Sequence, residues 1–417
     1  MFKTVVRKEH KNQWERRAPL TPEALSQLRE QGYSIDVETS DIRIFSDDKY
    51  QAAGATLVAT PHEHEFVIGI KEPPVNSIQS GQVHLAFSHT IKGQAINMPL
   101  LQRFLDQGAT LIDYEPIVDE KAQRTIAFGR YAGIAGAIDS FHIAGKKYQL
   151  KGIESPLTNV KATVDYSSID AIKAEFSKID VNSGEPVRVL VLGSGKVGQG
   201  SLEVCRWLGL PEISIDDLKS GEVPQGSWFA LARSKDCHQH KAGSPFDFEE
   251  FAQYGKERYE STFYQLLGRF DILLQTPFWT DDFPKHLPAK ILKNHRENLP
   301  VVIGDISCDI DGSLECTMQP SHTDAPAYTY CPESHSVKEG ISWQGPTVMA
   351  IDNLPCELPL DASEHFSSAL CHYVPAMMSM DLSLPFEDLE LPEAIKQGVI
   401  VYRGKLTEKY QYLNAYL

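Results

Sequence analysis

Short apolar runs alternate with segments of helical pattern over about the first 130 residues of the chain. The apolar runs predict buried strands at residues 2–6, 35–38, 66–70, 84–87 and 110–113. Helices are predicted between them, at residues 21–32, 46–54 and 97–107. The first helix has clear end signals, with Thr21 as its cap, Pro22 at the first helical position and Gly32 after its last turn. Strands and helices that alternate in this way predict a parallel α/β domain.

The pattern at residues 187–200, V-R-V-L-V-L-G-S-G-K-V-G-Q-G, is the most informative in the chain. Its first half is branched and apolar, as in a strand buried on both faces of a parallel sheet. Gly193, Gly195 and Gly198 follow in G-x-G-x-x-G spacing, and an amphipathic helix is predicted after them. A strand, a glycine turn and a helix in this order favour a dinucleotide site over an ordinary glycine-rich turn. The pyrophosphate would lie at the helix N-terminus.

A second strand, predicted at residues 213–215, is followed directly by Asp216 and Asp217. An acid near this offset from the glycine turn binds the ribose 2′-hydroxyl of NAD and repels the 2′-phosphate of NADP. The sequence therefore favours NAD and leaves open which aspartate is the ligand. NADP stays possible, because Lys219 or Arg233 would accept the phosphate if the chain brought either one back to the site.

The rest of the pattern predicts how the chain divides into domains. Residues 127–147 are rich in glycine and alanine, which predicts a closely packed helix connecting two domains. Residues 218–265 are charged and aromatic with little clear period, which predicts an insertion. Later segments predict strands at 270–275, 300–305 and 348–351, and a helix at 362–372. We expect an N-terminal catalytic domain of residues 1–135, completed by residues 330–417, and a Rossmann domain of residues 136–329.

Composition narrows the classes of partner. The 417 residues are 42% hydrophobic and 23% charged, as in a globular protein of two or three domains. A net charge of −16 argues against nucleic acid or an anionic membrane as the main partner. No apolar run approaches the ~18 residues of a membrane span, and no secretory signal is predicted. The seven cysteines lie scattered, and His62 and His64 fit an exposed turn, so we expect no metal site, no disulfides and a cytoplasmic location.

Ionisable residues stand at the ends of several predicted strands. They are Lys71, Glu72, His89, Asp113, Glu115 and Asp305. Ligands bind beyond the carboxyl ends of the strands in an open parallel sheet, where successive strand ends converge. A lone lysine or histidine is more often structural, so the prediction depends on the cluster. A lysine and a histidine facing a nicotinamide would do acid–base work if burial and neighbouring charges shifted their pKa values toward neutrality.

Motifs along almost the whole chain carry a family resemblance. They are E-R-R-A-P-L-T-P at 15–22, I-K-E-P-P at 70–74, F-S-H-T-I-K-G-Q at 87–94, I-D-Y-E at 112–115, R-T-I-A-F-G-R-Y-A-G-I-A-G at 124–136, G-D-I-S-C-D at 304–309, and I-D-N-L-P-C-E-L-P-L-D-A-S-E-H-F at 351–366. The chain resembles the saccharopine dehydrogenase (L-lysine-forming) and lysine–ketoglutarate reductase family, within the alanine dehydrogenase-like fold. The resemblance implies two Rossmann-like parallel-sheet α/β domains with the active site in the cleft between them. It also implies interconversion of saccharopine with L-lysine and 2-oxoglutarate by hydride transfer to or from NAD(P).

The resemblance further implies roles for single residues. Lys71 and His89 match the acid–base pair, and the positions thought to tune that pair are Glu72, Lys92 and Glu115. Substrate-contacting positions are Arg17, Gln94, Arg124 and Phe128, with Phe278 and Trp279 in a further pocket wall. Arginine suits this role because saccharopine carries three carboxylates. The cofactor positions are Gly193, Gly195, Lys196 and Gly198 in the glycine turn, Pro277, and Gly304, Asp305, Ile306 and Ser307 in a later loop.

Two alternatives stay open from the sequence. One is a related amino-acid dehydrogenase, such as alanine dehydrogenase, which would need only a small substrate pocket. The other is a catalytically silent dinucleotide sensor, against which the intact Lys71 and His89 argue. The predicted insertion resembles the reductase half of the bifunctional enzymes, which uses NADPH. The sequence leaves the physiological direction and the oligomeric state open.

Overall fold

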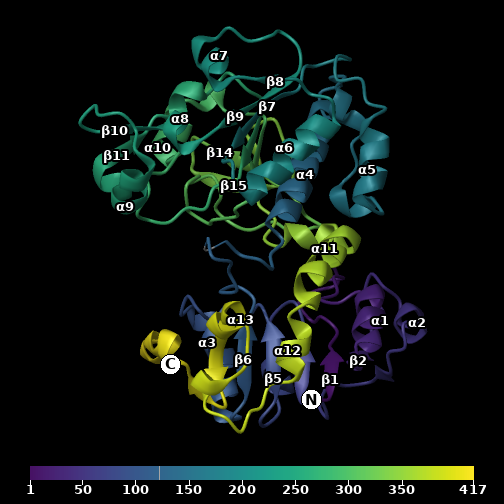
Figure 1. Cartoon of the computed structure of the whole chain (residues 1–417). Helices are drawn as coiled ribbons and strands as arrows, with labels where there is room; N and C mark the ends of the chain where they lie inside the picture. The colour runs from purple at the N-terminus through teal and green to yellow at the C-terminus, as the bar shows by residue number, and fades with distance from the viewer. Residues whose placement is uncertain (122) are drawn as a thin grey trace. The chain divides into compact units, whose positions relative to one another are not determined.

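The computed structural model describes residues 1–121 and 123–417 and divides into two compact units (Figure 1). The first unit comprises Met1–Phe128 and Pro359–Leu417, and the second comprises Gly129–Leu358. Both chain ends therefore belong to the first unit. The sequence places the return to the first domain after residue 329, whereas the chain returns at residue 359. The residues between carry strands that pair with the sheet of the second unit.

The first unit is built on a mostly parallel sheet, eight-stranded over the described residues, with the order β18-β17-β6-β5-β4-β1-β2-β3. Its strands are β1 (Thr4–Val6), β2 (Ile35–Glu38), β3 (Leu57–Val58), β4 (Phe66–Ile68), β5 (Val83–Ala86), β6 (Thr110–Asp113), β17 (Val399–Tyr402) and β18 (Lys405–Leu406). The strands from β6 to β3 run parallel, and β17 is antiparallel to β6. The carboxyl ends of β4, β5 and β6 therefore meet at one edge, and the predicted alternation of strands and helices is confirmed.

Helices cover this sheet. They are α1 (Pro22–Glu30), α2 (Asp47–Ala52), α3 (Met98–Asp106), α11 (Pro359–Cys371), α12 (Val374–Met378) and α13 (Glu393–Gly398). The Thr21 side chain caps α1 by accepting the Ala24 N–H at 3.2 Å, and Gly32 follows the helix with φ +91°. Both end signals are confirmed. Neighbouring residues of β6 face opposite layers, since Leu111 packs with Phe104 of α3 and Ile112 with the larger core cluster.

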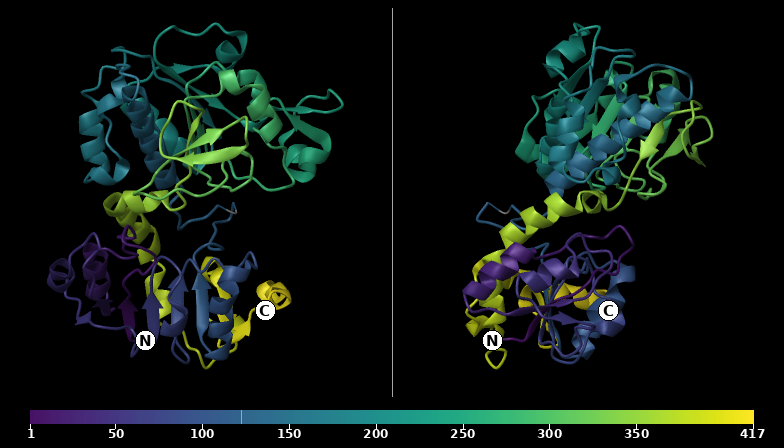
Figure 2. Two further views of the ribbon diagram at one scale, coloured as in Figure 1. Left: turned by 180° about the vertical axis from the view of Figure 1, so that it is seen from behind. Right: turned by 90° about the vertical axis from the view of Figure 1, so that its right-hand side faces the viewer.

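The second unit has its own sheet, eight-stranded over the described residues, with the order β15-β14-β16-β13-β12-β7-β9-β8. Its strands are β7 (Arg188–Leu192), β8 (Glu212–Ile213), β9 (Trp228–Ala232), β12 (Ile272–Gln275), β13 (Val302–Asp305), β14 (Tyr328–Cys331), β15 (Ser336–Glu339) and β16 (Thr347–Met349). A separate antiparallel pair is formed by β10 (His238–His240) and β11 (Tyr259–Ser261). The β14–β15 hairpin is light green in the left view of Figure 2; β14 pairs antiparallel with β16, and β15 pairs antiparallel with β14.

The helices of the second unit are α4 (Gly129–Gln149), α5 (Ile169–Phe176), α6 (Lys196–Trp207), α7 (Ile215–Ser220), α8 (Ser234–Cys237), α9 (Phe248–Arg258) and α10 (Ala289–Asn294). The helices α4 and α6 lie side by side (Figure 1). A Cβ on Gly133 of α4 would lie 1.9 Å from the Val197 carbonyl oxygen, and one on Gly200 of α6 would lie 2.1 Å from that of Arg130. The small residues that predict a closely packed helix near 127–147 are therefore needed for this approach.

Two predictions about the second unit are wrong. The predicted strand at 213–215 ends at Ile213, because the Ser214 side chain accepts the Asp217 N–H at 3.0 Å and caps α7. Asp216 and Asp217 therefore lie in the first turn of a helix. The predicted insertion at 218–265 contains β9, whose residues Trp228–Ala232 pair directly with β7. Only the later part of that segment, with β10, α9 and β11, stands outside the main sheet.

Within the described ranges 1–121 and 123–417, no helix is both long enough and apolar enough to cross a membrane. In the same ranges, no group of three or more His, Cys, Asp or Glu side chains is placed to hold a metal ion.

Candidate active site

Lys71 and His89 follow neighbouring strands of the first unit. Lys71 comes after β4 and His89 after β5, which pair in parallel. The Lys71 backbone is fixed on both sides, since its N–H donates to Glu9 Oε2 at 3.0 Å and its carbonyl accepts from the Arg7 guanidinium. His89 has φ +54°, a left-handed conformation uncommon for a residue with a side chain. The predicted placement of the pair at adjacent strand ends is therefore confirmed.

Burial and nearby charges shift the pKa values of this pair. Burial, then the positive charge of Arg17, lowers the pKa of Lys71 below its usual value. Burial, then the charge of Lys71, lowers the pKa of His89. Glu72 opposes both shifts, and its Oε2 lies 3.9 Å from His89 Nε2. Although burial acts to raise the pKa of Glu72, a 2.8 Å hydrogen bond from Lys11 leaves it below the usual value, so Glu72 is ionised.

The end of β6 adds a third set of groups to this edge. The buried Asp113 carboxylate accepts the Ser88 N–H at 2.8 Å and the Ser88 hydroxyl, which ties the ends of β5 and β6 together. Burial raises the pKa of Asp113 to about 6. The Glu115 N–H donates to the same carboxylate at 2.7 Å. The Glu115 charge raises the pKa of His89, so Glu72 and Glu115 both act on this histidine.

The two predicted carboxylate anchors differ in their surroundings. Arg17 donates from Nε and Nη2 to the two carboxylate oxygens of Glu15, at 2.7 and 2.5 Å, and both side chains are almost fully buried. The Arg17 guanidinium also lies 4.2 Å from the Phe128 ring centroid. Arg124 donates to Glu115 and is 51% exposed. Arg124 therefore has the accessibility that a substrate anchor needs, whereas Arg17 holds a buried ion pair.

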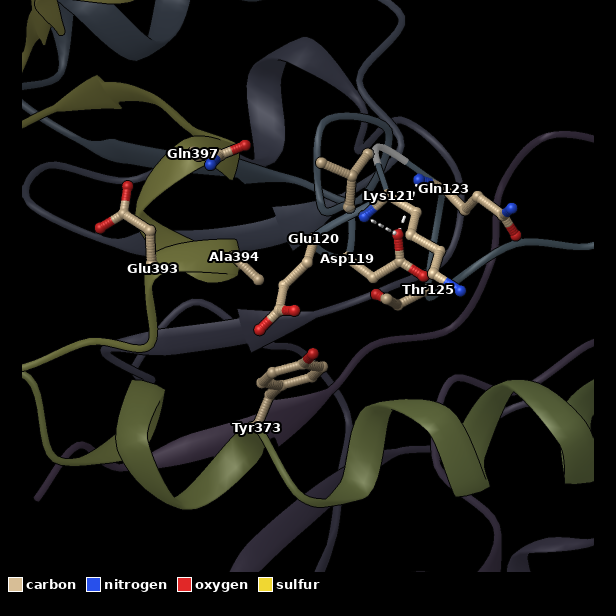
Figure 3. Close-up of a pocket in the computed structure, with 10 residues that line it drawn as sticks. Asp119, Glu120, Lys121, Gln123, Thr125, Tyr373, Glu393, Ala394 and Gln397 are labelled. Carbon is tan, nitrogen blue, oxygen red and sulfur yellow. Dashed lines mark hydrogen bonds between the residues drawn. The ribbon is translucent and has the colours of Figure 1, made fainter.

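The loop after β5 carries the other predicted residues of the first unit. Lys92 and Gln94 are exposed there, and the Asn97 amide donates to the His89 carbonyl at 2.9 Å. A separate cavity of about 620 Å³ is lined by residues 118–121, 123 and 125, by Tyr373 and by α13 (Figure 3). It contains none of the predicted site residues. Its carboxylates, from Asp119, Glu120 and Glu393, make it unsuited to an acidic substrate.

The glycine turn at residues 193–198 of the second unit has the geometry of a phosphate site. Gly193 has φ +97°, and a Cβ on Gly198 would lie 2.0 Å from the Gly193 carbonyl oxygen. Gly195 is the N-cap of α6 and provides no side-chain cap, while a Cβ there would meet open space. Lys196 is the first helical residue and is exposed. The N–H groups at the start of a helix suit an anion such as a pyrophosphate.

The predicted cofactor loop after β13 is held mainly by its own contacts. The Asp305 carboxylate accepts the hydroxyl groups of Ser307 and Thr317, both at 2.7 Å, and burial raises its pKa to about 6. Gly304 lets β13 approach α4, since a Cβ there would lie 2.2 Å from the Ser140 hydroxyl oxygen. The Ile306 N–H donates to the Gln275 carbonyl at 2.9 Å. These contacts fix the loop at the carboxyl edge of the sheet.

Pro277, Phe278 and Trp279 line an apolar cavity of about 240 Å³ at the same edge. Phe278 is 74% exposed, and the Trp279 indole N–H donates to the Pro284 carbonyl at 3.3 Å.

Sequence reasoning gave no role to His238 and His286, which line the same cavity. It also missed Glu9 and Lys11 of the first unit. The sequence shows that charged residues follow the first strand. It does not show that β1 pairs with β4, which brings these residues to Lys71.

The second unit carries a phosphate turn, and the first carries a lysine and a histidine at neighbouring strand ends. Together these features define a two-unit, dehydrogenase-type α/β protein. The family model described as "Alanine dehydrogenase/PNT, N-terminal domain" matches residues 5–135, and the model described as "Alanine dehydrogenase/PNT, C-terminal domain" matches residues 177–409. The chain belongs to the alanine dehydrogenase/PNT family. Among solved structures, an L-alanine dehydrogenase has a TM-score of 0.64 at 19% identity, covering 99% of each chain. A transhydrogenase from Sinorhizobium meliloti has a TM-score of 0.60 at 15% identity, covering 97% of this chain and all of that one.

Curated relatives narrow the family further. The chain is 32% identical to an alpha-aminoadipic semialdehyde synthase of Arabidopsis thaliana, over 96% of this chain and 40% of that protein. It is 30% identical to a mitochondrial alpha-aminoadipic semialdehyde synthase of Rattus norvegicus, over 98% of this chain and 47% of that protein. It is also 30% identical to a saccharopine dehydrogenase [NAD(+), L-lysine-forming] of Neurospora crassa, over 88% of each chain. The resemblance to the saccharopine dehydrogenase family is confirmed, although the chain spans less than half the length of the two synthases. The cytoplasmic location stays a prediction.

Proposed function

We propose that the chain is an NAD(P)-dependent dehydrogenase that acts on the CH–NH bond of saccharopine and interconverts it with L-lysine and 2-oxoglutarate. The observation that carries the proposal is the Lys71–His89 pair, at neighbouring strand ends with both pKa values lowered. The printed name of the Neurospora crassa relative supports the substrate class. The carboxylate chemistry of that substrate also suits the half-exposed Arg124.

The proposed reaction needs two kinds of proton transfer. Oxidation of saccharopine removes a hydride from carbon and a proton from the secondary amine, which gives an imine. Water then adds to the imine carbon, and proton transfers between oxygen and nitrogen release lysine and 2-oxoglutarate. Lys71 and His89 would hold and move these protons, one at the amine nitrogen and the other at the added water. The lowered pKa values support the role, because each group then gains and loses a proton more readily near neutral pH.

The phosphate turn fits a dinucleotide, since Gly195 leaves the start of α6 open and Gly193 and Gly198 allow the tight turn. A bound nicotinamide cofactor would accept or supply the hydride. The turn would hold its pyrophosphate, and the positive charge of Lys196 at the start of α6 would balance part of the phosphate charge. The predicted active-site cleft between the two domains stays a prediction.

For the cofactor's ribose, we propose Arg233 in place of Asp216 and Asp217, and hence a preference for NADP(H). The Gly193 N–H of the phosphate turn donates to the Ala232 carbonyl at 2.9 Å, so the end of β9 lies directly beside the turn. The exposed Arg233 is the next residue. Asp216 and Asp217 instead follow the edge strand β8, which β9 separates from β7. An arginine next to the first Rossmann strand suits a 2′-phosphate.

The activity is tested by incubating the purified chain with lysine, 2-oxoglutarate and NADPH or NADH and detecting saccharopine. Lys71→Met and His89→Gln should each lower kcat by ~10²-fold or more. Lys49→Met and His62→Gln change exposed residues of the same unit and should leave kcat unchanged. Turnover of pyruvate with ammonia in place of these substrates would favour an alanine dehydrogenase instead. Binding of a dinucleotide without turnover would favour a sensor.

The cofactor proposal is tested by kcat/KM for NADPH and NADH side by side. Arg233→Ala should raise KM for NADPH by about 10- to 100-fold, the worth of charged hydrogen bonds, and leave KM for NADH nearly unchanged. Asp216→Ala, Asp217→Ala and the distant Arg296→Ala should change neither value. A preference for NADH that Asp216→Ala or Asp217→Ala erodes would restore the aspartates as the ribose ligands.

A further inference from the structure

His89 lies in the loop between β5 and α3, and its backbone conformation there is unfavourable. Its φ of +54° is in the left-handed region, which a residue with a side chain keeps only where surrounding contacts hold it. Ser88 before it is tied to the Asp113 carboxylate, and the His89 carbonyl accepts the Asn97 amide at 2.9 Å. Contacts on the loop between His89 and Asn97 therefore contribute to where the imidazole lies.

A segment far along the chain supplies two such contacts. The Tyr412 hydroxyl donates to the Ile91 carbonyl at 2.6 Å, across 321 residues of sequence. Tyr412 belongs to the 3-10 helix η9 (Glu408–Ala415), and Tyr416 lies directly after that helix. The Tyr416 ring lies against Gly93, where a Cβ would come within 2.6 Å of the ring. The two tyrosines thus contact the loop two and four residues after His89.

The helix η9 is itself anchored to the sheet of the first unit. Leu413 is fully buried in the core cluster that contains Leu111 of β6, and Ile91 of the His89 loop packs against the same cluster. The Tyr410 hydroxyl donates to the Gln397 carbonyl at 2.6 Å. Because these contacts fix η9 in place, Tyr412 and the residues after it form a firm support for the loop.

We propose that Tyr412 and Tyr416 are positioning residues, which hold the His89 imidazole in place by bracing residues 91–93 of its loop. The inference rests on the proposed function, in which His89 moves protons, and both tyrosines act through that histidine. Without the Tyr412 hydroxyl, the Ile91 carbonyl would bond to water and the loop would relax toward the backbone conformations that residues with side chains prefer. Relaxation would expose more of an imidazole that is now 38% exposed.

An NMR titration of the histidine-labelled chain, without substrate or cofactor, tests the bracing independently of turnover. The His89 resonance is the one that His89→Gln removes. Burial has the largest effect on the pKa of His89 and lowers it; among the charges, Lys71 and Lys11 lower it, while Glu72 and Glu115 raise it. A loosened loop relieves burial, so the pKa of His89 should rise when the bracing is lost.

Tyr412→Phe and Tyr416→Ala should each raise the pKa of His89. Tyr412→Phe should also lower kcat by about 2- to 10-fold, the worth of one hydrogen bond, and leave KM for the cofactor unchanged. The matched control is Tyr410→Phe, which removes a hydroxyl from the same helix and should change neither quantity. The control also covers direct electrostatic effects, because the Glu115 charge acts on Tyr410 as it does on Tyr412.

Gly93→Ala tests the second contact from the side of the loop. It should raise the pKa of His89 as well, and by less when Tyr416→Ala has already removed the ring that the new Cβ meets. Additive effects would remove Tyr416 from the role. Since Tyr412 and Tyr416 are 49% and 53% exposed, their variants should fold like the wild type, which thermal unfolding checks.

The titration separates failure of the bracing from failure of the proposed function. An unchanged pKa of His89 in both Tyr412→Phe and Tyr416→Ala would overturn the inference, even where the wild type turns over saccharopine. A raised pKa in both variants supports the bracing. If the wild type then shows no turnover with either cofactor, that result counts against the proposed function alone.

Discussion

Glu72→Gln should move the whole pH profile of kcat/KM to lower pH. The Glu72 carboxylate raises the pKa of both Lys71 and His89, so its removal lowers both values further. The direction is the same whichever group acts as the acid and whichever as the base. Glutamine keeps the size of the side chain and an oxygen that accepts from Lys11, so the change removes mainly charge.

The size of the shift follows from the 3.9 Å separation of His89 Nε2 and Glu72 Oε2. Coulomb's law gives about 1 kcal/mol for this distance in water and about 4 kcal/mol at an effective dielectric constant of 20. One pKa unit corresponds to about 1.4 kcal/mol, so these limits span about 0.8 to 3 units. The His89 and Glu72 side chains are 38% and 27% exposed, and solvent screens the pair. We therefore expect a shift of about one unit.

The measurement is kcat/KM from about pH 5 to 10 for the wild type and three variants. Glu115→Gln should move the limb that belongs to His89 to lower pH, because the Glu115 charge raises the pKa of that residue. Glu63→Gln alters a side chain that is 91% exposed and should leave both limbs in place. If both limbs of Glu72→Gln coincide with those of the wild type, the profile reports groups other than Lys71 and His89.

Three further predictions concern stability and substrate binding. Arg17→Ala should lower the free energy of unfolding in urea by about 3–5 kcal/mol, because the buried Glu15 carboxylate loses its partner. Arg124→Ala should unfold like the wild type and raise KM for 2-oxoglutarate or saccharopine by the equivalent of about 1.5–3 kcal/mol. An unchanged KM would show that Arg124 is not a substrate anchor. Gly133→Ala should lower the free energy of unfolding of the second unit by about 3 kcal/mol or more. The control is Gly129→Ala, whose Cβ would lie 3.5 Å from the nearest neighbouring atom and which should change this free energy by less than about 1 kcal/mol. Equal effects of the two variants would contradict the close packing of α4 on α6. Burial, then the nearby Asp139 carboxylate, raises the pKa of Glu357. The free energy of unfolding of the wild type should therefore fall as pH rises above about 4.5, by up to about 1.4 kcal/mol per pH unit, and Glu357→Gln should reduce this loss. Plots of unfolding free energy against pH that run parallel for the two proteins from pH 5 to 8 would refute this prediction.

Much of the first unit follows from the sequence alone. Its strands are short apolar runs in chain order, and β4, β5 and β6 also neighbour one another in the sheet. Residues that follow these strands therefore meet in space, which is why Lys71 and His89 were found together. The ion partners were harder to predict, because Glu9 and Lys11 reach the site through the non-consecutive pairing of β1 and β4. The burial of the Arg17–Glu15 pair depends on how the helices cover it, which no local pattern records.

The second unit shows where reasoning from local pattern stops. The fingerprint around Gly193 is local, so the strand, the turn and α6 were all predicted. The ribose ligand depends on which strand lies beside β7, and the sequence offers two candidates in succession. The first, β8, precedes two acids and fits the usual spacing, yet it is two residues long and lies at the edge. The second, β9, is longer and fully apolar, and the hydrogen bonds of five residue pairs with β7 stabilise the inner position. Length and apolarity of the run thus favour β9 as the neighbour of β7, and with it an arginine in place of an acid beside the phosphate turn.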